Sequence, residues 1–460
     1  MFDTVTLPVW LFALIILFAA VTALSHVFIP PVRWFLRRRL ERAVTRLNER
    51  LTVPIHPLKL LRRQDMILRL SYDPVVLEAV AQHAREEGIR EDVAHSTAKR
   101  YAREIVPSFS ATAYFGFATR VARWLSTRLY DVHVTRAEGG ETRPDETVVF
   151  VMNHRSNMDY VLVTYLAADR SALSYAVGEW ARIWPISRLL RGMGAYFIRR
   201  RSRNPLYRRV LARYVQIATA GGVAQAIFPE GGLSLNGAVG PAKLGLFSYI
   251  VDGYVENGRE IAFVPVSLNY DRVLEDNILV SADRAGNRRF RGSFVTGSAF
   301  VLRWLWRRMT GKVRRFGVAA VSFGAPIRLS DFGATPDTKA LARQVMGAIA
   351  ANVPVLAAPM VAASVLGGAR TRDTVVADVA RMRTELEARG VPVCIPEEQT
   401  EDAVDRALSL YVLRHVLTLT DGQIALLDRS ETILPFYAAS VPELNAAAQE
   451  VRPEPDVTGT

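Results

Sequence analysis

The sequence predicts an α/β protein: a layered domain with a mostly parallel sheet, flanked by N- and C-terminal helical regions and preceded by one transmembrane helix. Its 460 residues, 50% of them hydrophobic, can bury roughly one large core or two to three smaller ones. Short β-branched runs alternate with helical segments in the middle of the chain, and one long apolar run lies near its start. Such alternation favours strands joined by helical crossovers, and therefore parallel pairing.

The apolar run spans residues 7–29 and contains no acidic or basic residue apart from His26. As a helix it would measure ~35 Å, enough to cross a hydrocarbon core of ~30 Å. A signal peptide is the alternative, but no basic residue precedes the run and no convincing cleavage site follows it. Five arginines follow it, so we expect a single-pass protein of the inner (plasma) membrane that faces the cytoplasm: Arg33, Arg37, Arg38, Arg39 and Arg42.

Three regions are expected after the span. Residues 45–131 should form an N-terminal helical domain, because the segment 75–89 repeats apolar residues three and four apart and the segment 91–106 begins with acidic residues and ends with basic ones. Residues 132–330 should form the α/β domain. Residues 336–448 are alanine-rich and should be helical, with helices ending at Gly390 and near Leu417, and residues 449–460 should form a disordered tail.

The strands of the α/β domain are expected at seven β-branched runs: residues 131–135, 147–152, 173–177, 195–198, 224–228, 261–267 and 318–323. Helical segments lie between several of them. In the segment 206–222, for example, Leu206, Val210, Tyr214 and Ile217 fall on one face before two glycines end the helix.

The formal net charge of +13 is carried almost entirely by arginine, because the chain has only five lysines. We therefore expect acidic partners, such as phosphates, anionic lipid or an acidic protein. Neither zinc-ligand spacing nor an aromatic RNA-binding signature is present, so a nucleic-acid partner is not expected. The sequence also lacks a metal-ligand cluster and a dinucleotide fingerprint, and no bound cofactor is expected.

Cys394 is the only cysteine, which excludes an intrachain disulfide and a cysteine-based zinc site. Its apolar neighbours favour a buried inert thiol over a nucleophile. Ser156 as an acyl-bearing nucleophile would lack the glycines of a strand-to-helix elbow.

The segment VMNHRSNMDY, residues 151–160, places His154 after an apolar strand and Asp159 five residues later. On one straight helix the two side chains would lie ~140° apart and could not pair. If His154 lies in a turn and Asp159 in the first turn of the next helix, the carboxylate can reach Nδ1 and leave Nε2 outward. Such a base can take the proton of a hydroxyl that attacks a thioester. A capping asparagine beside a packed histidine is the alternative.

Three further segments carry possible binding groups. GAYFIRRR, residues 194–201, brings Arg199, Arg200 and Arg201 to the end of a short strand, where guanidinium groups suit phosphate oxygens. In FPEGGLS, residues 228–234, Glu230 precedes two glycines that let backbone amides approach a ligand closely. VPVSLNYDR, residues 264–272, closes a strand. The alternatives are a solvated basic face, a plain turn, and a core strand with its loop.

In this order and at this spacing, the four segments resemble the four acyltransferase blocks of the glycerol-3-phosphate acyltransferase family, especially the large bacterial membrane-bound type. The resemblance covers roughly residues 55–445 and implies a first step of phospholipid synthesis, acylation of the sn-1 hydroxyl of glycerol 3-phosphate. The donor would be acyl-CoA or acyl carrier protein. The implied catalytic pair is His154 as general base with Asp159 as its partner.

The resemblance also implies a set of substrate-binding residues. Arg199 and Arg200 would meet the acceptor phosphate, Glu230 and Gly231 would shape the acceptor site, and Pro265 would lie beside the acyl group. The same motifs add the remaining expected substrate contacts: Arg155, Ser156, Arg201, Gly232, Ser234 and Lys243.

One residue departs from the family pattern. The family usually carries an arginine after the second glycine of the third block, where this chain has Leu233. We expect Lys243 or Arg201 to replace the missing phosphate ligand. Otherwise the acceptor could be a lysophosphatidate or dihydroxyacetone phosphate, and a non-catalytic membrane lipid-binding protein is the alternative of another class.

Two segments mix arginines with aromatic residues, at residues 117–130 and 298–316. Trp124, Trp304 and Trp306 beside arginines suit a helix that lies on anionic membrane lipid. Half-buried helices with a solvated basic face are the alternative.

Overall fold

The computed structural model describes residues 8–11, 14, 16, 63–137, 139–167, 173–178, 186–199, 202, 204–254, 258–286, 315–333, 336–395 and 399–442. The expected span at residues 7–29 is described at only a few positions, and the expected tail at 449–460, like Trp304 and Trp306, lies outside the described residues. Within the described ranges, none of the helices is long and apolar enough to cross a membrane.

An eight-stranded sheet forms the centre of the described chain, in the order β1-β7-β6-β2-β5-β3-β4 with β8 beside β6. Five of its neighbouring pairs are parallel, whereas β7 and β8 run antiparallel to β6. The strands are β1 (Asp131–Arg136), β2 (Thr147–Met152), β3 (Ser174–Val177), β4 (Ala195–Phe197), β5 (Gln225–Ile227), β6 (Ile261–Tyr270), β7 (Val318–Phe323) and β8 (Ile327–Arg328). The predicted α/β fold with a mostly parallel sheet is confirmed, and each of the seven predicted strands is present.

Strand β2 lies in the middle of the sheet and is buried along its whole length. Its side chains alternate between two cores, because successive residues of a strand point to opposite faces. Val149 and Val151 belong to one hydrophobic cluster, and Val148, Phe150 and Met152 to the other. A strand covered on both faces reads as a continuous apolar run, as TVVFVM does.

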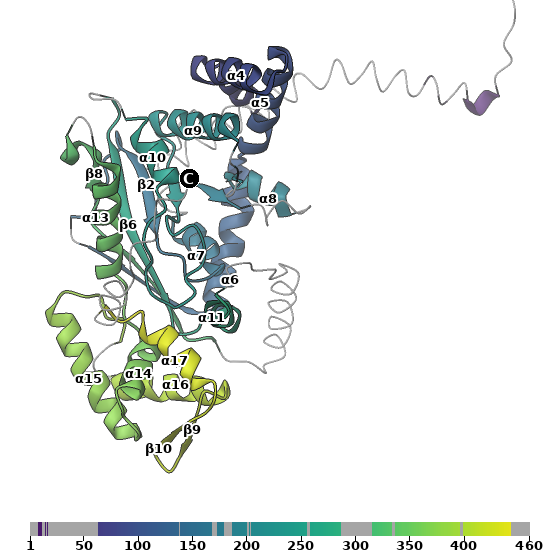
Figure 1. Cartoon of the computed structure of the whole chain (residues 1–460). Coiled ribbons are helices and arrows are strands. Elements are labelled where there is room, and N and C mark those ends of the chain that lie inside the picture. The colour runs from purple at the N-terminus through teal and green to yellow at the C-terminus, as the bar shows by residue number, and fades with distance from the viewer. Residues whose placement is uncertain are drawn as a thin grey trace, which may run out of the picture.

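The N-terminal helices cover the face of Val149 and Val151 together with α9, α10 and α13. In Figure 1, α4, α5 and α9 lie above the sheet. Helix α4 begins after the capping residue Asp73 and ends at Gly88, which adopts a left-handed conformation. The helices on this face are α3 (Arg63–Ser71), α4 (Pro74–Glu87), α5 (Glu91–Ile105), α9 (Pro205–Ala220), α10 (Gly245–Val251) and α13 (Thr338–Ala351). The π-helix η1 (Thr112–Ala118) leads into α6 (Thr119–Leu129), whose Leu125 and Leu129 belong to the cluster on the other face.

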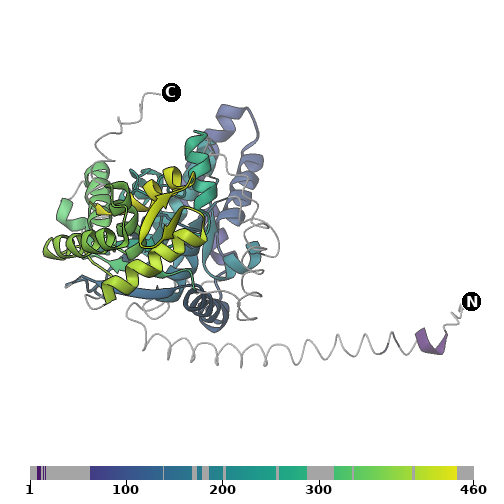
Figure 2. The same cartoon turned by 90° about the horizontal axis from the view of Figure 1, so that it is seen from below.

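The C-terminal helices pack into the cluster on the other face of the sheet and lie at its lower end in Figure 1. Figure 2 shows this region from below, with the short β9–β10 hairpin against the helices. The elements are α14 (Ala357–Leu366), α15 (Arg372–Ala388), α16 (Thr400–Leu413), β9 (Leu417–Thr420), β10 (Gln423–Leu426) and α17 (Ser430–Ala438). Helices α7 (Met158–Ala167), α8 (Ile186–Gly192) and α11 (Asp276–Arg284) and the 3-10 turn η3 (Leu329–Phe332) complete the described elements.

Two expected boundaries are wrong. The helix expected to end near Leu417 ends at Leu413, and Leu417 begins the antiparallel hairpin of β9 and β10. The sixth strand continues past residue 267 to Tyr270, since its polar residues Ser267 and Asn269 are buried and bonded to carbonyl groups of the C-terminal region. Polar side chains with buried partners extend a strand that the sequence pattern would end.

Candidate active site

The loop between β2 and α7 begins with Asn153, whose side chain continues the pairing of β2 with β6. The Asn153 amide donates to the Leu268 carbonyl at 3.0 Å, and the Leu268 amide donates to the Asn153 side-chain oxygen at 2.8 Å. Both partners are buried. The asparagine therefore fixes the point at which the chain leaves the sheet, one residue before His154.

His154 and Asp159 meet as the spacing predicted. His154 lies in the loop, Asp159 lies in the first turn of α7, and 2.9 Å separates His154 Nδ1 from Asp159 Oδ2. The same carboxylate oxygen accepts the backbone amides of Arg155 and Ser156 at 2.7 and 3.0 Å. Nε2 of His154 has no hydrogen-bond partner among the described residues. The ring is held in one orientation by an anchored carboxylate, which is the geometry of an oriented general base.

Tyr270 completes the surroundings of Asp159, and the sequence analysis missed it. Its hydroxyl donates to Asp159 Oδ1 at 2.6 Å across a separation of 111 residues. Tyr270 is fully buried at the end of β6, and burial raises the pKa of its hydroxyl well above the ordinary value, so it remains a donor. A tyrosine after a polar run in VPVSLNYDR is a weak signal, because only the extended β6 brings it to α7.

Glu230 lies on the other side of His154. Its Oε1 accepts the His154 backbone amide at 2.9 Å, and Oε2 accepts the Gly240 amide at 3.1 Å. The side chain is 8% exposed, and burial raises the pKa of the Glu230 carboxyl from 4.5 to about 7. The third block is therefore tied directly to the histidine loop, as the sequence analysis expected for residues of one site.

Lys243 reaches the glycines that follow Glu230. Gly231 has φ +66°, and a Cβ built on it would lie 2.9 Å from Lys243 Cδ and 3.2 Å from Nζ. The Lys243 backbone amide donates to the Pro229 carbonyl at 2.8 Å. Lys243 is exposed, and Leu233 is half-buried against the core that contains β2 and α7. A cationic side chain thus lies over Gly231, whereas the leucine turns toward the protein interior.

Ser234 connects the third block to His154 through its backbone. The Ser234 amide donates to the His154 carbonyl at 2.8 Å, and the Ser234 hydroxyl donates to the Ala238 carbonyl at 2.7 Å. The same hydroxyl accepts the Gly237 amide at 3.1 Å. The side chain therefore holds the turn at residues 234–238, while Gly232 beside it has open space around its Cα.

Arg155 and Ser156 point into the protein. Arg155 is 2% exposed, donates through Nη1 to the Gly237 carbonyl and lies 5.1 Å from the Phe436 ring centre. Its Nε and Nη2 have no hydrogen-bond partner within the described part of the chain. The Ser156 hydroxyl donates to Glu275 Oε2 at 2.8 Å, and Glu275 also accepts the Asn157 side chain at 3.0 Å. Both side chains fix the loop.

Arg199 is paired with the N-terminal helices. Its guanidinium donates to both oxygens of Glu104 at 2.8 and 2.7 Å, and it lies 5.4 Å from the ring centres of Tyr101 and Tyr207. A phosphate would have to share this guanidinium with the carboxylate. Arg200 and Arg201 lie outside the described residues. Pro265 is buried within β6, opposite Val151, and not at a strand end.

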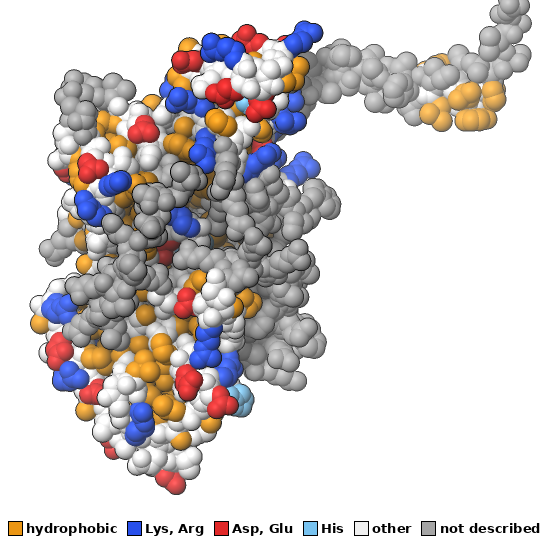
Figure 3. Space-filling model, in the orientation of Figure 1, with side chains coloured by type: hydrophobic (Ala, Val, Ile, Leu, Met, Phe, Trp, Pro, Cys, Tyr) orange, Lys and Arg blue, Asp and Glu red, His pale blue; other side chains and the backbone are white. Residues whose placement is uncertain are grey.

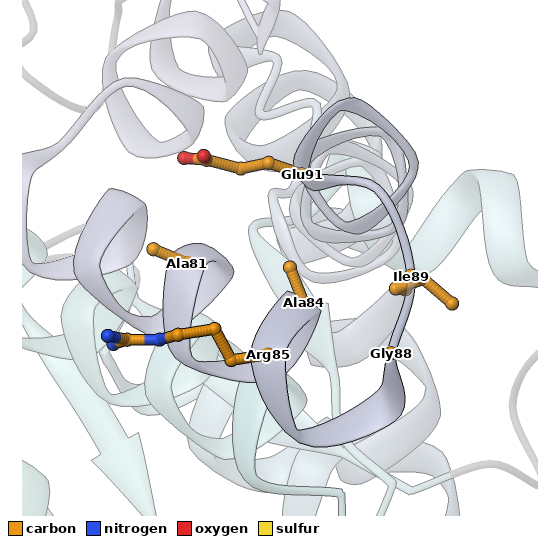
Figure 4. A pocket seen from close by; sticks show the side chains of 6 residues that line it. All are labelled: Ala81, Ala84, Arg85, Gly88, Ile89 and Glu91. Atoms are coloured by element: carbon orange, nitrogen blue, oxygen red, sulfur yellow. The ribbon is translucent and has the colours of Figure 1, made fainter.

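A separate shallow pocket lies between α4 and α5, lined by Ala81, Ala84, Arg85, Gly88, Ile89 and Glu91 (Figure 4). It shares no residue with the His154 loop. Within the described ranges, it supplies one arginine and one carboxylate and no histidine.

Two protein families match the chain. The Acyltransferase family matches residues 134–269, which include the His154 loop and Glu230 and end one residue before Tyr270. The family described as glycerol-3-phosphate acyltransferase C-terminal region matches residues 302–438, which end within α17. The first match runs from within β1 to within β6, and the second contains β7, β8 and the C-terminal helices.

Curated relatives and a solved structure are also similar to the chain. The glycerol-3-phosphate acyltransferase of Pseudomonas savastanoi pv. phaseolicola is 30% identical over 283 residues, covering 60% of this chain and 33% of the relative. That of Ectopseudomonas mendocina is 31% identical over 277 residues, covering 59% and 32%. The match thus spans about a third of these relatives. The crystal structure of a 1-acyl-sn-glycerophosphate acyltransferase from Thermotoga maritima is 17% identical, with a TM-score of 0.33, covering 62% of this chain and 94% of that one.

Proposed function

We propose that the chain is a member of the glycerol-3-phosphate acyltransferase family and transfers a fatty acyl group from a thioester donor to the sn-1 hydroxyl of glycerol 3-phosphate. The donor is acyl-CoA or acyl carrier protein, and the reaction uses no further cofactor. The observation that carries the proposal is the buried His154–Asp159 pair at the end of the central strand β2.

The proposed reaction is a direct acyl transfer. His154 Nε2 takes the proton of the acceptor hydroxyl while the hydroxyl oxygen attacks the thioester carbonyl carbon. The tetrahedral intermediate collapses, the carbon–sulfur bond breaks, and the sulfur leaves as a thiol with the proton that His154 held. Asp159 holds the Nδ1 tautomer and stabilises the imidazolium that forms. No acyl group is attached to the protein at any step.

Glu230 and the glycines after it border the acceptor in this proposal. The Glu230 carboxylate already accepts the His154 amide, so a hydroxyl bound beside it would lie next to the base. Gly231 and Gly232 present backbone without side chains at the same place. Pro265 and its strand form the apolar wall under the acyl group.

Lys243 is the proposed ligand of the acceptor phosphate. Its side chain lies over Gly231, beside the position where the family usually carries an arginine and this chain has Leu233. Arg199, Arg200 and Arg201 form the second cationic group, with Arg199 shared by Glu104. Because Leu233 stands where the family usually carries an arginine, a lysophosphatidate is the second candidate acceptor.

Membrane association is part of the proposal. Residues 112–130 contain no acidic residue, and the exposed residues Phe117, Val121 and Trp124 share their surface with Arg120 and Arg128. Apolar and basic groups on one helix face suit an anionic lipid surface. Helix α6 packs directly on α7, which carries Asp159. The span at residues 7–29 would anchor the chain in the inner membrane, with the site on the cytoplasmic side.

Thiol release tests the proposal. The detergent-solubilised protein is given palmitoyl-CoA or palmitoyl acyl carrier protein with glycerol 3-phosphate, dihydroxyacetone phosphate or lysophosphatidate. We expect release that requires glycerol 3-phosphate and falls at least ~100-fold in His154→Ala, as losing a general base commonly costs ~100- to 10,000-fold. The control is His133→Ala, which removes a half-exposed histidine of β1 and should keep full activity.

The outcomes separate the alternatives. Release only with lysophosphatidate would keep the chemistry and replace the acceptor. Absence of release with every donor and acceptor would favour the non-catalytic lipid-binding alternative. Full activity in His154→Ala would contradict the mechanism.

A further inference from the structure

The last described helix, α17, and the residues directly after it contact three segments that surround the catalytic pair. It lies at the lower end of the sheet in Figure 1, and its sequence, SETILPFYA, is mostly buried. Its residues contact the turn at 234–238 and the turn at 273–276, and Ser440, just after the helix, contacts the end of β6. Each of these segments is hydrogen-bonded to the loop that carries His154 or to Asp159 itself.

The first contact joins α17 to the turn at residues 234–238, which begins at the end of the FPEGGLS segment. Gly237 has φ +85°, and a Cβ built on it would lie 1.8 Å from the Phe436 carbonyl oxygen. The Gly237 carbonyl accepts Arg155 Nη1, and the Arg155 guanidinium lies over the Phe436 ring. The Phe436 backbone therefore contacts the glycine whose carbonyl accepts Arg155, and the Phe436 ring contacts the Arg155 guanidinium directly.

The second contact joins α17 to the turn before α11. The Tyr437 hydroxyl donates to Asp276 Oδ2 at 2.6 Å and accepts the Val273 amide at 2.9 Å. Arg414 donates to the same carboxylate and to the same hydroxyl, the latter at 3.2 Å. All these groups are buried, so the turn has one defined position.

That position is passed on to the histidine loop by Glu275. Glu275 lies between Val273 and Asp276 in the chain, and its carboxylate accepts the Ser156 hydroxyl at 2.8 Å and the Asn157 side chain at 3.0 Å. Ser156 in turn donates its backbone amide to Asp159 Oδ2. Hydrogen bonds therefore connect Tyr437 to the carboxylate that orients His154 by way of the backbone of residues 273–276 and of Ser156.

The third contact lies at the end of β6. The Asn269 side chain donates to Ser440 Oγ at 3.2 Å and to the Pro354 carbonyl at 2.9 Å. The next residue, Tyr270, donates to Asp159 Oδ1. The segment that follows α17 thus helps to fix the strand end that supplies the second bond to Asp159.

From these contacts we infer that α17 positions the catalytic pair, with Tyr437 acting through Glu275 as the principal positioning residue. The inference rests on the proposed function, because it assigns a role to the C-terminal region within that reaction. Tyr437 and Glu275 touch neither substrate nor the reacting atoms. They determine where the Asp159 carboxylate and the His154 ring stand.

The experiment compares two tyrosines that each lose one buried hydroxyl. Tyr437→Phe removes the bonds to Asp276 and Val273. The matched control Tyr411→Phe removes a 2.8 Å bond to the Ala358 carbonyl in the same region, and neither Tyr411 nor Ala358 is hydrogen-bonded to the histidine loop within the described part of the chain. Both rings are fully buried, and the melting temperatures show how much stability each variant loses apart from any effect on turnover. Michaelis constants, turnover and melting temperature are measured for both, and for Glu275→Gln alone and combined with Tyr437→Phe.

We expect Tyr437→Phe to lower kcat by about 10- to 100-fold with little change in KM, since small displacements of catalytic groups have effects of this size. Tyr411→Phe should stay within about twofold of the unchanged protein in kcat. The double variant should be no slower than Glu275→Gln, because both substitutions interrupt one chain of contacts. Equal kcat losses for the two tyrosines, or a double variant that loses the product of both effects, would overturn the inference.

Hydrogen exchange gives a reading that does not depend on activity. Peptides covering residues 153–158 should exchange faster in Tyr437→Phe and Glu275→Gln than in Tyr411→Phe, because the Arg155 and Ser156 amides are bonded to Asp159. If the protein without substitutions releases no thiol, the proposed function is rejected. The difference in exchange would in that case still support positioning of the histidine loop by α17. If Tyr437→Phe cannot be purified, Phe436→Leu takes its place. Equal exchange in all variants would reject positioning by α17.

Discussion

Asp159 receives hydrogen bonds from four groups, and Tyr270 supplies the one that arrives from a different strand. Removing its hydroxyl in Tyr270→Phe leaves Oδ1 without that donor and lets the carboxylate rotate. We expect kcat to fall about tenfold or more, because a base loses rate when its orienting group is displaced. Steady-state thiol release at saturating substrate measures this.

The control for Tyr270 is its neighbour Tyr130, whose ring centre lies 5.3 Å away and whose hydroxyl donates to the Arg272 carbonyl at 2.8 Å. Tyr130→Phe removes a hydroxyl from the same ring pair without touching Asp159. A similar kcat for the two variants would show that Tyr270 contributes packing alone.

Glu230 makes the stability of the fold depend on pH. The folded state holds its proton more tightly than the unfolded chain, because burial raises the carboxyl pKa from 4.5 to about 7. The free energy of unfolding should therefore fall by roughly 3 kcal/mol as pH rises from 4.5 to 7, and then level off. Glu230→Gln cannot ionise and should lack this slope.

Urea denaturation from pH 4.5 to 8 checks the Glu230 prediction. The relevant quantity is the difference between the two proteins in free energy of unfolding, because other buried carboxyls such as Glu275 titrate in both. A difference that stays constant across this range would contradict a raised Glu230 pKa.

The ammonium group of Lys243 should bind the negatively charged phosphate of the acceptor. Lys243→Met keeps an unbranched apolar side chain over Gly231 and removes the ammonium group. We expect KM for glycerol 3-phosphate to rise about tenfold with a small change in kcat. This is the effect of losing an interaction that binds the substrate and the transition state equally. The control Lys339→Met removes an exposed lysine of α13. An unchanged KM in Lys243→Met would assign the phosphate to the arginines at residues 199–201.

At the level of secondary structure, the junction between α17 and the turn at 234–238 depends on a glycine. In Gly237→Ala the new methyl group would overlap the Phe436 carbonyl oxygen, and a positive φ is strained for alanine. We expect a loss of at least ~2 kcal/mol in stability and a loss of activity. Thermal and urea unfolding measure the first, thiol release the second.

Gly347→Ala is the matched control for Gly237. Gly347 lies exposed inside α13, and a Cβ there meets no atom within 4 Å. Alanine should stabilise this helix by ~0.5–1 kcal/mol and leave activity unchanged. Destabilisation in both variants would mean that glycine-to-alanine changes are harmful for reasons other than the contact with Phe436.

The elements differ in how far the sequence predicts them. The strands β2 and β6 follow from continuous apolar runs, and the capped helices α4 and α9 follow from apolar residues that recur at helical spacing after a capping residue. The β9–β10 hairpin was missed, since its two strands are short and mostly exposed and carry little apolar pattern of their own. The end of β6 was missed because Ser267 and Asn269 are satisfied only by distant carbonyl groups.

For the molecule as a whole, the site was predictable where it is local in sequence. His154 and Asp159 meet within one loop, and their spacing predicts the contact. Tyr270, Glu275 and Phe436 come from segments more than 100 residues away, and no local pattern shows that the sheet and α17 bring them together. The ion pair of Arg199 with Glu104 was hidden for the same reason.

The distribution of charge predicts where the molecule meets lipid. Acidic and basic side chains are mixed over the N-terminal helices at the top of Figure 3, whereas residues 112–130 carry arginine without acid. In the full chain reconstituted into vesicles, a polarity-sensitive label at Val121→Cys in a Cys394→Ala background should shift to shorter wavelength with anionic lipid. The shift should weaken between 0.1 and 1 M salt, as the screening length falls from ~10 to ~3 Å.

The control label is Gln344→Cys, on the exposed side of α13, which lies across the sheet from α6 in Figure 1. It should report the same solvent in neutral and anionic vesicles. A shift of both labels, or of neither, would exclude α6 as the lipid-facing surface.

The alternation of side chains along β2 divides the protein into two halves that can vary separately. A substitution at Val149 or Val151 changes the packing against the N-terminal helices. A substitution at Phe150 or Met152 changes the packing against the C-terminal helices. During evolution the core residues of either half can therefore change independently of the other half. The strand between them still ends at the same edge of the sheet and holds His154 in the same place. Swapping one half between relatives should thus be tolerated better than exchanging the strand itself.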